Sequence, residues 1–339
     1  MSARRGAGVA GATVAVVLTL VAAGCGSTSD AASNTSISAV SGAPTSTTAT
    51  SGPSTTTTTL PNPCRADDPT RSYPPSALPP AGQLPSGAWA DRIRSNGVLR
   101  VGVDENTLFF SSKDPLTGEI SGFEDALAHA IAAAILGDRE KVKFVTVTTS
   151  EKINVVHDDV VDLSIDVNTI GCGRWGFVDF STAYYRAFLQ MMVRGDSPIT
   201  GQADLPGKRV CVTSPSSSED FVTQNIPTAK LVRVITRTEC LTRLQENKVD
   251  AIVLPSSIMA GLAVQDPNNK VFPDALVDTK GNRSTNTYGI AVNKNNQDLT
   301  RFVNALLEQW RHDGTLTKLQ DENLPIYLRE PTPTPAYLG

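Results

Sequence analysis

Arg174 and the serine run at 214–218 are the residues whose side-chain chemistry is easiest to interpret. A guanidinium group presents its donors in a planar fork, which suits a two-pronged pair with a carboxylate. The serines lead into a predicted helix, and the free N–H groups at a helix N-terminus bind anions. Both features indicate an anion site, although a surface ion pair would also explain an arginine and simple N-capping would also explain Ser218.

Groups suited to catalysis are scarce in this chain. A nucleophile–histidine–acid set is not apparent, because His129, His157 and His312 all fall on predicted helices. Acid catalysis in a cleft needs a carboxyl group with a raised pKa, and Glu105 and Asp166 are the candidates. No Cys/His spacing is typical of a metal site. We therefore expect no enzyme, no catalytic residue, no cofactor and no metal.

The length and charge of the chain further limit the classes of protein to which it can belong. Its 339 residues suffice for two domains of ordinary size. The net charge of −4 provides no basic field for nucleic acid, so we exclude a nucleic-acid partner.

Two runs of alternating strands and helices are predicted. The first has strands at 99–103, 143–148 and 161–167 and helices at 90–95, 123–136 and 152–157. The second has strands at 208–212, 231–235 and 250–254, and helices capped by Ser218, at 240–246 and from 256 onward. The chain returns through 288–292 and a helix at 299–311. Such alternation predicts an α/β fold with parallel strands.

The N-terminal segment has the pattern of an export signal. Arg4 and Arg5 precede an apolar run over 9–23, and small residues then lead to Cys25. Residues 26–85 are rich in Ser, Thr and Pro and predict a disordered tether, whose proline-rich end from 63 to 88 is expected to wrap the first lobe.

Six short segments, in this order along the chain, resemble the bacterial extracellular solute-binding proteins of family 3. This family contains the polar amino-acid-binding proteins of ABC importers, including the glutamine- and glutamate-binding type. The segments are Gly97–Asp104, Gly118–Glu124, Arg174 with Val178–Ser181 and Tyr184–Tyr185, Leu205–Val210, Lys248–Ala251 and Asp313–Thr315. The segment before Cys25 likewise resembles a lipoprotein signal, with Ala22 where leucine is usual.

The resemblance implies a two-lobed periplasmic-binding-protein fold of type II with two crossing hinge strands. We place these strands at 190–193 and 288–292, lobe 1 at 86–192 and 289–330, lobe 2 at 193–288 and a C-terminal tail at 331–339. Five cysteines in an exported chain leave one unpaired, which fits lipidation of Cys25. Three pairings of the others are possible, and the assignment to lobes favours Cys211–Cys240 and Cys64–Cys172.

The ligand in such a fold binds beyond the carboxyl ends of the strands. The resemblance gives Arg174 the ligand carboxylate, Thr169 a second contact to it, and Phe109 or Phe110 an aromatic wall. The expected ligand residues are Asp104, Phe109, Phe110, Asp166, Thr169, Arg174, Ser214, Ser216, Ser217 and Ser256.

This chain departs from the family pattern at the position that holds a ligand ammonium. Ser256 stands where amino-acid binders carry an acid, and Pro215 and serines replace the usual glycines of the preceding loop. Either Asp166 or Asp104 supplies the missing carboxylate, or the ligand is not an ordinary α-amino acid.

The resemblance implies a receptor outside the cytoplasmic membrane, lipid-anchored there through Cys25, as by palmitate. Its ligand would be a small polar carboxylate, such as glutamate, aspartate or glutamine, and its partner an ABC importer permease. The alternatives are a sensor that signals to a membrane protein, a scaffold that binds no ligand, and a dehydratase-type enzyme on the same fold.

Overall fold

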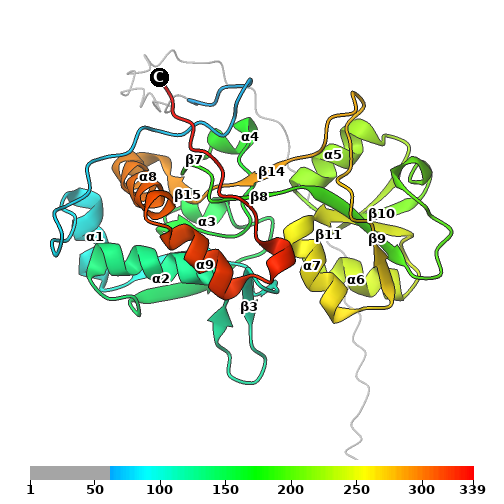
Figure 1. The fold of residues 1–339 in the computed structure, drawn as a ribbon, viewed down its shortest axis with the longest axis horizontal. Coiled ribbons are helices and arrows are strands. Elements are labelled where there is room, and N and C mark those ends of the chain that lie inside the picture. Colours follow the sequence, from blue (N-terminus) through cyan, green and yellow to red (C-terminus); the bar gives the residue numbers. More distant parts are fainter. Residues whose placement is uncertain (1–61) are drawn as a thin grey trace, which may run out of the picture. The chain divides into compact units, whose positions relative to one another are not determined.

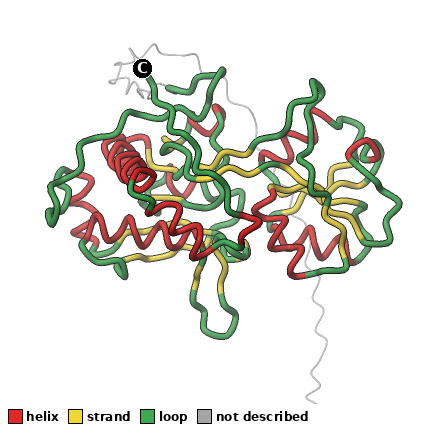
Figure 2. Tube along the Cα trace, in the orientation of Figure 1, coloured by secondary structure: helices red, strands yellow, loops and turns green. Residues whose placement is uncertain are grey.

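The computed structural model describes residues 62–339, which form two α/β lobes joined by a narrow pair of strands (Figure 1). Each lobe is built on one five-stranded sheet with helices packed around it (Figure 2). The signal segment, Cys25 and the first part of the predicted tether lie outside the described residues.

The sheet of lobe 1 has the strand order β5-β1-β6-β15-β7. Its strands are β1 (Leu99–Val103), β5 (Val142–Thr146), β6 (Leu163–Ser164), β7 (Val178–Phe180) and β15 (Ala291–Asn293). β1 is parallel to β5 and β6, whereas β15 is antiparallel to β6 and β7. The carboxyl ends of β1 and β6 therefore open at the same edge of the sheet.

Seven helices accompany this sheet. They are α1 (Ala88–Asn96), α2 (Phe123–Leu136), α3 (Asn154–His157), α4 (Cys172–Trp175), α8 (Gln297–His312), α9 (Thr315–Asn323) and the short η3 (Ile326–Leu328). The bounds of α2 are those predicted, because Gly122 and Gly137 adopt positive φ angles at its two ends. A small sheet of β2 (Asn106–Thr107), β3 (Ser111–Lys113) and β4 (Ile120–Ser121) extends from the same lobe.

The sheet of lobe 2 has the strand order β11-β10-β12-β9-β13. Its strands are β9 (Leu189–Arg194), β10 (Arg209–Thr213), β11 (Lys230–Val234), β12 (Ala251–Pro255) and β13 (Asn269–Val271). Its helices are η1 (Gln202–Asp204), α5 (Ser217–Asn225), α6 (Arg237–Gln245) and α7 (Ser256–Gln265). β10 is parallel to β11 and β12, so the N-termini of α5, α6 and α7 follow the carboxyl ends of these strands.

The lobes are connected by β8 (Tyr185–Ala187) and β14 (Asn286–Tyr288), which pair in antiparallel fashion. The first crossing strand therefore lies earlier than the expected 190–193, which belongs to β9 inside the sheet of lobe 2. The sequence does not distinguish the two, because residues 187–193 are apolar except for Gln190. The second crossing strand also precedes most of the expected 288–292, whose end forms β15.

The segment 62–85, assigned by its composition to the tether, has a defined path across lobe 1. The Ser72 hydroxyl donates to the Phe180 carbonyl, and Ser72 forms a β-bridge with Tyr337 near the C-terminus. The proline-rich end is thus an ordered strap, as the expected wrapping of lobe 1 requires, and the disordered tether does not extend to residue 85. Two short helical turns, η1 and η2 (Lys294–Asn296), complete the regular structure.

The two lobes pack directly against each other through α6 and α7. One continuous apolar cluster includes Leu241 and Met259 of lobe 2 together with Phe110 and Tyr185. A Cβ added to Gly261 of α7 would lie 3.0 Å from the Cβ of Leu108 in lobe 1. The structure therefore shows the lobes in close contact.

Candidate ligand-binding site

A small cavity lies between the lobes at the carboxyl ends of the strands. Its volume is about 20 Å³, which accommodates about one water molecule. Lobe 1 contributes Thr149, Lys152, Val167, Thr169 and Arg174, and lobe 2 contributes Thr213, Ser216, Ser217, Ser218, Arg237, Pro255 and Ile258. Larger hollows lie away from the strand ends, such as one of about 670 Å³ along the strap beside Cys64 and Arg301 and one of about 580 Å³ on lobe 2 beside Arg194 and Asp266.

Arg174 lines the cavity from lobe 1, on the short helix α4. Its Nη1 donates to the Thr169 carbonyl at 2.9 Å, which orients the guanidinium group. Burial lowers the pKa of Arg174, and the carboxylate of Asp220 opposes this effect. No carboxylate of the described residues forms an ion pair with Arg174, so its fork is free for the two-pronged contact.

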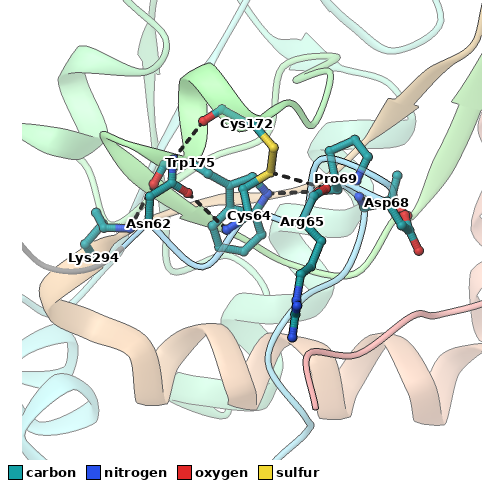
Figure 3. The surroundings of a disulfide bond; sticks show 9 residues. Asn62, Cys64, Arg65, Asp68, Pro69, Cys172, Trp175 and Lys294 are labelled. Atoms are coloured by element: carbon teal, nitrogen blue, oxygen red, sulfur yellow. Dashed lines mark hydrogen bonds between the residues drawn. A yellow bond between two sulfur atoms is a disulfide. The ribbon is translucent and has the colours of Figure 1, made fainter.

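The strap holds α4 in place through the contacts around a disulfide bond (Figure 3). A disulfide joins Cys64 to Cys172, and the Trp175 indole donates to the Pro69 carbonyl at 3.0 Å. The Asn62 amide donates to the Cys172 carbonyl, and Lys294 donates to the carbonyl of Trp175. A helix of four residues has little stability alone, so these contacts determine where Arg174 lies.

Three hydroxyl and amide groups connect the lobes near Arg174. The Thr169 and Ser217 hydroxyls are 3.2 Å apart, and the Asn286 amide donates to both. Ser216 accepts from the Glu219 N–H and therefore caps α5, whereas Ser218 was the predicted cap. The Ser218 hydroxyl is fully buried beside the cavity and has no partner among the described residues.

Arg237 lines the cavity from lobe 2 and is paired with two acids of lobe 1. Its Nη1 is 2.8 Å from Oδ1 of Asp104, and its Nη2 donates to Oδ1 of Asp166 at 2.7 Å. Lys152 approaches Oδ2 of Asp166 at 3.7 Å and donates to its backbone carbonyl at 2.8 Å. Arg237 also donates to the Thr107 hydroxyl. The two acids expected to hold a ligand ammonium are therefore engaged by the protein's own cations.

Burial shapes the protonation of these groups. Burial lowers the pKa of Lys152 to about 8, with Asp166 opposing the shift. Burial raises the pKa of Asp166, and Arg237 and Lys152 oppose that rise. For Arg237 burial acts to lower the pKa, but Asp104 and Asp166 outweigh it and the net shift is upward. The charged side chains that line the cavity itself are Lys152, Arg174 and Arg237, so its electrostatics favour an anion.

A buried acid supports the cavity wall from behind. Val167 has a φ angle of 39°, a left-handed conformation that is strained for a β-branched residue. Its N–H donates to Oε1 of Glu124 at 2.7 Å, and Tyr184 donates to the same oxygen. Burial, with Asp166 nearby, raises the pKa of Glu124 to about 7. Strain at the cavity wall is typical of a functional site.

The structure brings only some of the expected ligand residues to the cavity. Thr169, Arg174, Ser216 and Ser217 line it, and Asp104 and Asp166 lie behind Arg237. The remaining expected residues lie elsewhere: Phe109, Phe110, Ser214 and Ser256.

Phe110 is a core residue. It is fully buried and packs against Phe123 and Tyr185, with ring centroids 6.1 and 5.0 Å away. Phe109 packs against the same core, and Ser256 accepts from the Phe188 N–H at the start of α7. The expected aromatic wall is therefore part of the hydrophobic core, because the hairpin β2–β3 turns these side chains away from the cavity.

Sequence reasoning missed Lys152, Thr149 and Arg237. The helix α6 was predicted to begin at Cys240, which left Arg237 in a loop, whereas it begins at Arg237. Thr236 directly before Arg237 is a good N-cap type and was the available signal.

Within residues 62–339 no helix is long and apolar enough to cross a membrane, and no group of His, Cys, Asp and Glu side chains is arranged to hold a metal ion.

The chain is similar to curated proteins over about two thirds of its length. The ABC transporter glutamine-binding protein GlnH of Bacillus subtilis is 30% identical over 223 residues, which cover 66% of this chain and 79% of that protein. The glutamate-binding protein GluB of Corynebacterium glutamicum is 25% identical over 248 residues, covering 70% and 83% of the two chains.

Solved structures of amino-acid-binding proteins are also similar to this chain. The cysteine-binding protein from Campylobacter jejuni has a TM-score of 0.64 at 27% identity and covers 70% of this chain and 94% of its own. An ancestral arginine-binding protein bound to glutamine has a TM-score of 0.61 at 31% identity and covers 67% and 98%. The family model for bacterial extracellular solute-binding proteins, family 3, matches residues 99–325. The resemblance of the sequence is thereby confirmed, and the chain belongs to the bacterial extracellular solute-binding proteins of family 3.

Proposed function

We propose that this protein is an extracellular receptor that binds a small polar carboxylate between its lobes and delivers it to an ABC importer. The observation that carries the proposal is the cavity between the lobes, where Arg174, Lys152 and Arg237 are the charged side chains of the lining. The ligand carboxylate pairs with the guanidinium of Arg174, near the Thr169 hydroxyl and the N-terminus of α5. Lipid attachment at Cys25 keeps the receptor at the outer face of the cytoplasmic membrane.

Acidic and amide amino acids are the first ligands to test. The relatives include proteins named for binding glutamine and glutamate. Glutamate and aspartate each bring a net negative charge to a cavity lined by cations. A cavity of about 20 Å³ is far smaller than the several hundred Å³ of typical ligand sites, so binding requires the lobes to separate and close again.

The test is a thermal-stability screen of the full-length protein against amino acids, dicarboxylates and small aromatic acids. A ligand at 100 times its dissociation constant adds about 2.7 kcal/mol of stability. We expect at least one carboxylate to raise the melting temperature of the wild type and not that of Arg174→Ala. A carboxylate that stabilises both proteins equally would place the ligand away from Arg174.

A second candidate is a closed scaffold that binds a protein partner, such as a membrane sensor, without a small ligand. The observation that favours it is the engagement of Asp104 and Asp166 by Arg237, which closes the lobes with residues of the protein itself. A screen in which no carboxylate changes the melting temperature would support this candidate over the receptor.

A further inference from the structure

Arg237 joins the two lobes through a buried ion-pair network. It belongs to α6 of lobe 2, whereas its partners Asp104, Asp166 and Thr107 all belong to lobe 1. Arg237 is 1% exposed, and Asp104 and Asp166 are 3% and 0% exposed. Thr107 and Asp166 precede Arg237 by 130 and 71 residues, so tertiary closure alone brings the network together.

The local position of Arg237 does not explain its presence. It is the first residue of α6, where the helix dipole disfavours a positive charge. The Cys211–Cys240 disulfide joins α6 to β10, and Cys240 lies one turn after Arg237 on the same buried face. The disulfide therefore fixes the direction in which the Arg237 side chain projects from lobe 2. The favourable interactions that offset its burial come from lobe 1.

Because these ion pairs are buried, they stabilise the closed arrangement of the lobes. A buried guanidinium or carboxylate is costly unless it is paired and hydrogen-bonded. In the closed arrangement one guanidinium is bound by two carboxylates and a hydroxyl of the opposite lobe. If the lobes separate, Arg237 leaves all of these partners at once, so the pairing acts only in the closed state.

We propose that Asp104 and Asp166 form a guanidinium-binding seat in lobe 1, and that Arg237 of lobe 2 occupies it as an internal ligand that closes the lobes. The proposal rests on the proposed function and deepens it, because the seat pairs with Arg237 and is distinct from the carboxylate site at Arg174. The internal ligand fills the position in which a basic group of an external ligand would bind. The wild-type receptor therefore excludes ligands with a guanidinium group, and the external ligand provides the anionic group.

The test replaces the internal ligand by a free one. In Arg237→Ala the seat loses its guanidinium group and keeps only the lobe 1 contact of Lys152 to Asp166, so we expect the radius of gyration from small-angle X-ray scattering to rise relative to the wild type. Methylguanidinium should bind this variant with a dissociation constant in the millimolar range, as expected for a few charge-assisted hydrogen bonds, and should restore the wild-type radius. The wild type should show at least tenfold weaker binding of methylguanidinium by calorimetry.

Arg243→Ala is the matched control, because Arg243 is on the same helix but forms a surface pair with Glu239. It should keep the wild-type radius and bind no methylguanidinium. An unchanged radius in Arg237→Ala, or a variant that binds methylguanidinium no better than the wild type, overturns the proposal.

If Arg237→Ala does not fold, Arg237→Lys carries the same test. An ammonium group cannot bridge both carboxylates in the manner of a guanidinium fork, so a radius above that of the wild type is expected and an unchanged one overturns the proposal. Methylguanidinium carries no carboxylate, so these results do not depend on Arg174. Failure of the carboxylate screen alone would count against the proposed function and leave the seat intact.

Discussion

Each lobe brings one arginine to the cavity, and the two arginines are paired differently. Arg174 donates to a backbone carbonyl, and its fork is free of ion-pair partners among the described residues. Arg237 pairs with Asp104 and Asp166 and donates to Thr107, while its Nε has no partner among the described residues. Residue type alone therefore does not tell the two arginines apart. The nearby carboxylates determine whether a guanidinium group is paired within the protein or left open.

Mutations in the Arg237 network should lower the stability of the protein more than mutations at Arg174. Asp166→Ala removes the carboxylate that faces both Arg237 and Lys152, which leaves buried positive charge without compensation. We expect a loss of about 3–5 kcal/mol in the free energy of unfolding, measured by urea denaturation. Asp196→Ala, which breaks the exposed pair with Arg194, should cost less than about 1 kcal/mol. Equal losses in the two variants would mean that the buried network is not held by charge.

The position of Arg174 depends on the strap. Replacing Cys64 and Cys172 by serine should lower the free energy of unfolding by about 2–4 kcal/mol and weaken carboxylate binding, because α4 is then held by fewer contacts. The Cys211–Cys240 disulfide closes a shorter loop, with its cysteines 29 rather than 108 residues apart. Replacing these two cysteines by serine should therefore lower the free energy of unfolding by about 1 kcal/mol less. That variant should affect closure of the lobes and leave binding at Arg174 less changed. The reverse assignment of the two effects would refute the comparison.

The buried acid Glu124 makes the free energy of unfolding depend on pH. Its pKa in the folded protein is about 7, raised by burial from an ordinary value of 4.5. The folded state therefore binds the proton more strongly, and this stabilisation is complete below pH 4.5 and lost as the pH rises to 7. The loss amounts to about 3 kcal/mol for this group.

Glu124→Gln keeps an acceptor for Val167 but does not titrate, so its unfolding free energy should fall less between pH 4.5 and 7 than that of the wild type. Asp125, whose pKa burial raises to about 8, continues to titrate in both proteins and serves as the shared background. Identical pH profiles would show that Glu124 is not proton-linked to folding.

The smallest effect on the unliganded protein is expected at Arg174. Arg174→Ala removes a partly exposed cation without an ion-pair partner among the described residues, so stability should change by less than about 1 kcal/mol. Carboxylate affinity should fall by about 1.5–3 kcal/mol, or roughly tenfold to more than a hundredfold, in calorimetric titration. Arg186→Ala, on the exposed side of hinge strand β8, should leave affinity unchanged. A similar loss in both variants would exclude a specific role for Arg174.

Local signals made much of the fold predictable. The apolar spacing over 123–136 predicted the bounds of α2, and the alternation of strands and helices predicted the class. Arg174 and Thr169 were predicted through a local motif, and both line the cavity. Arg237 was not, since its partners Asp104 and Asp166 are distant in sequence and no pattern near α6 announces them. Phe110 illustrates the converse, because a core phenylalanine and a binding-site phenylalanine have the same sequence signal.

The strap and the C-terminal segment meet on lobe 1, where Ser72 pairs with Tyr337. Lobe 2 is inserted between β8 and β14 and contains neither end of the described segment. A force applied between residue 62 and residue 339 is therefore carried by lobe 1, and it does no work when lobe 2 rotates. The balance between open and closed states is consequently insulated from tension on the ends of the folded part, and a reporter attached at either end would not hinder the motion.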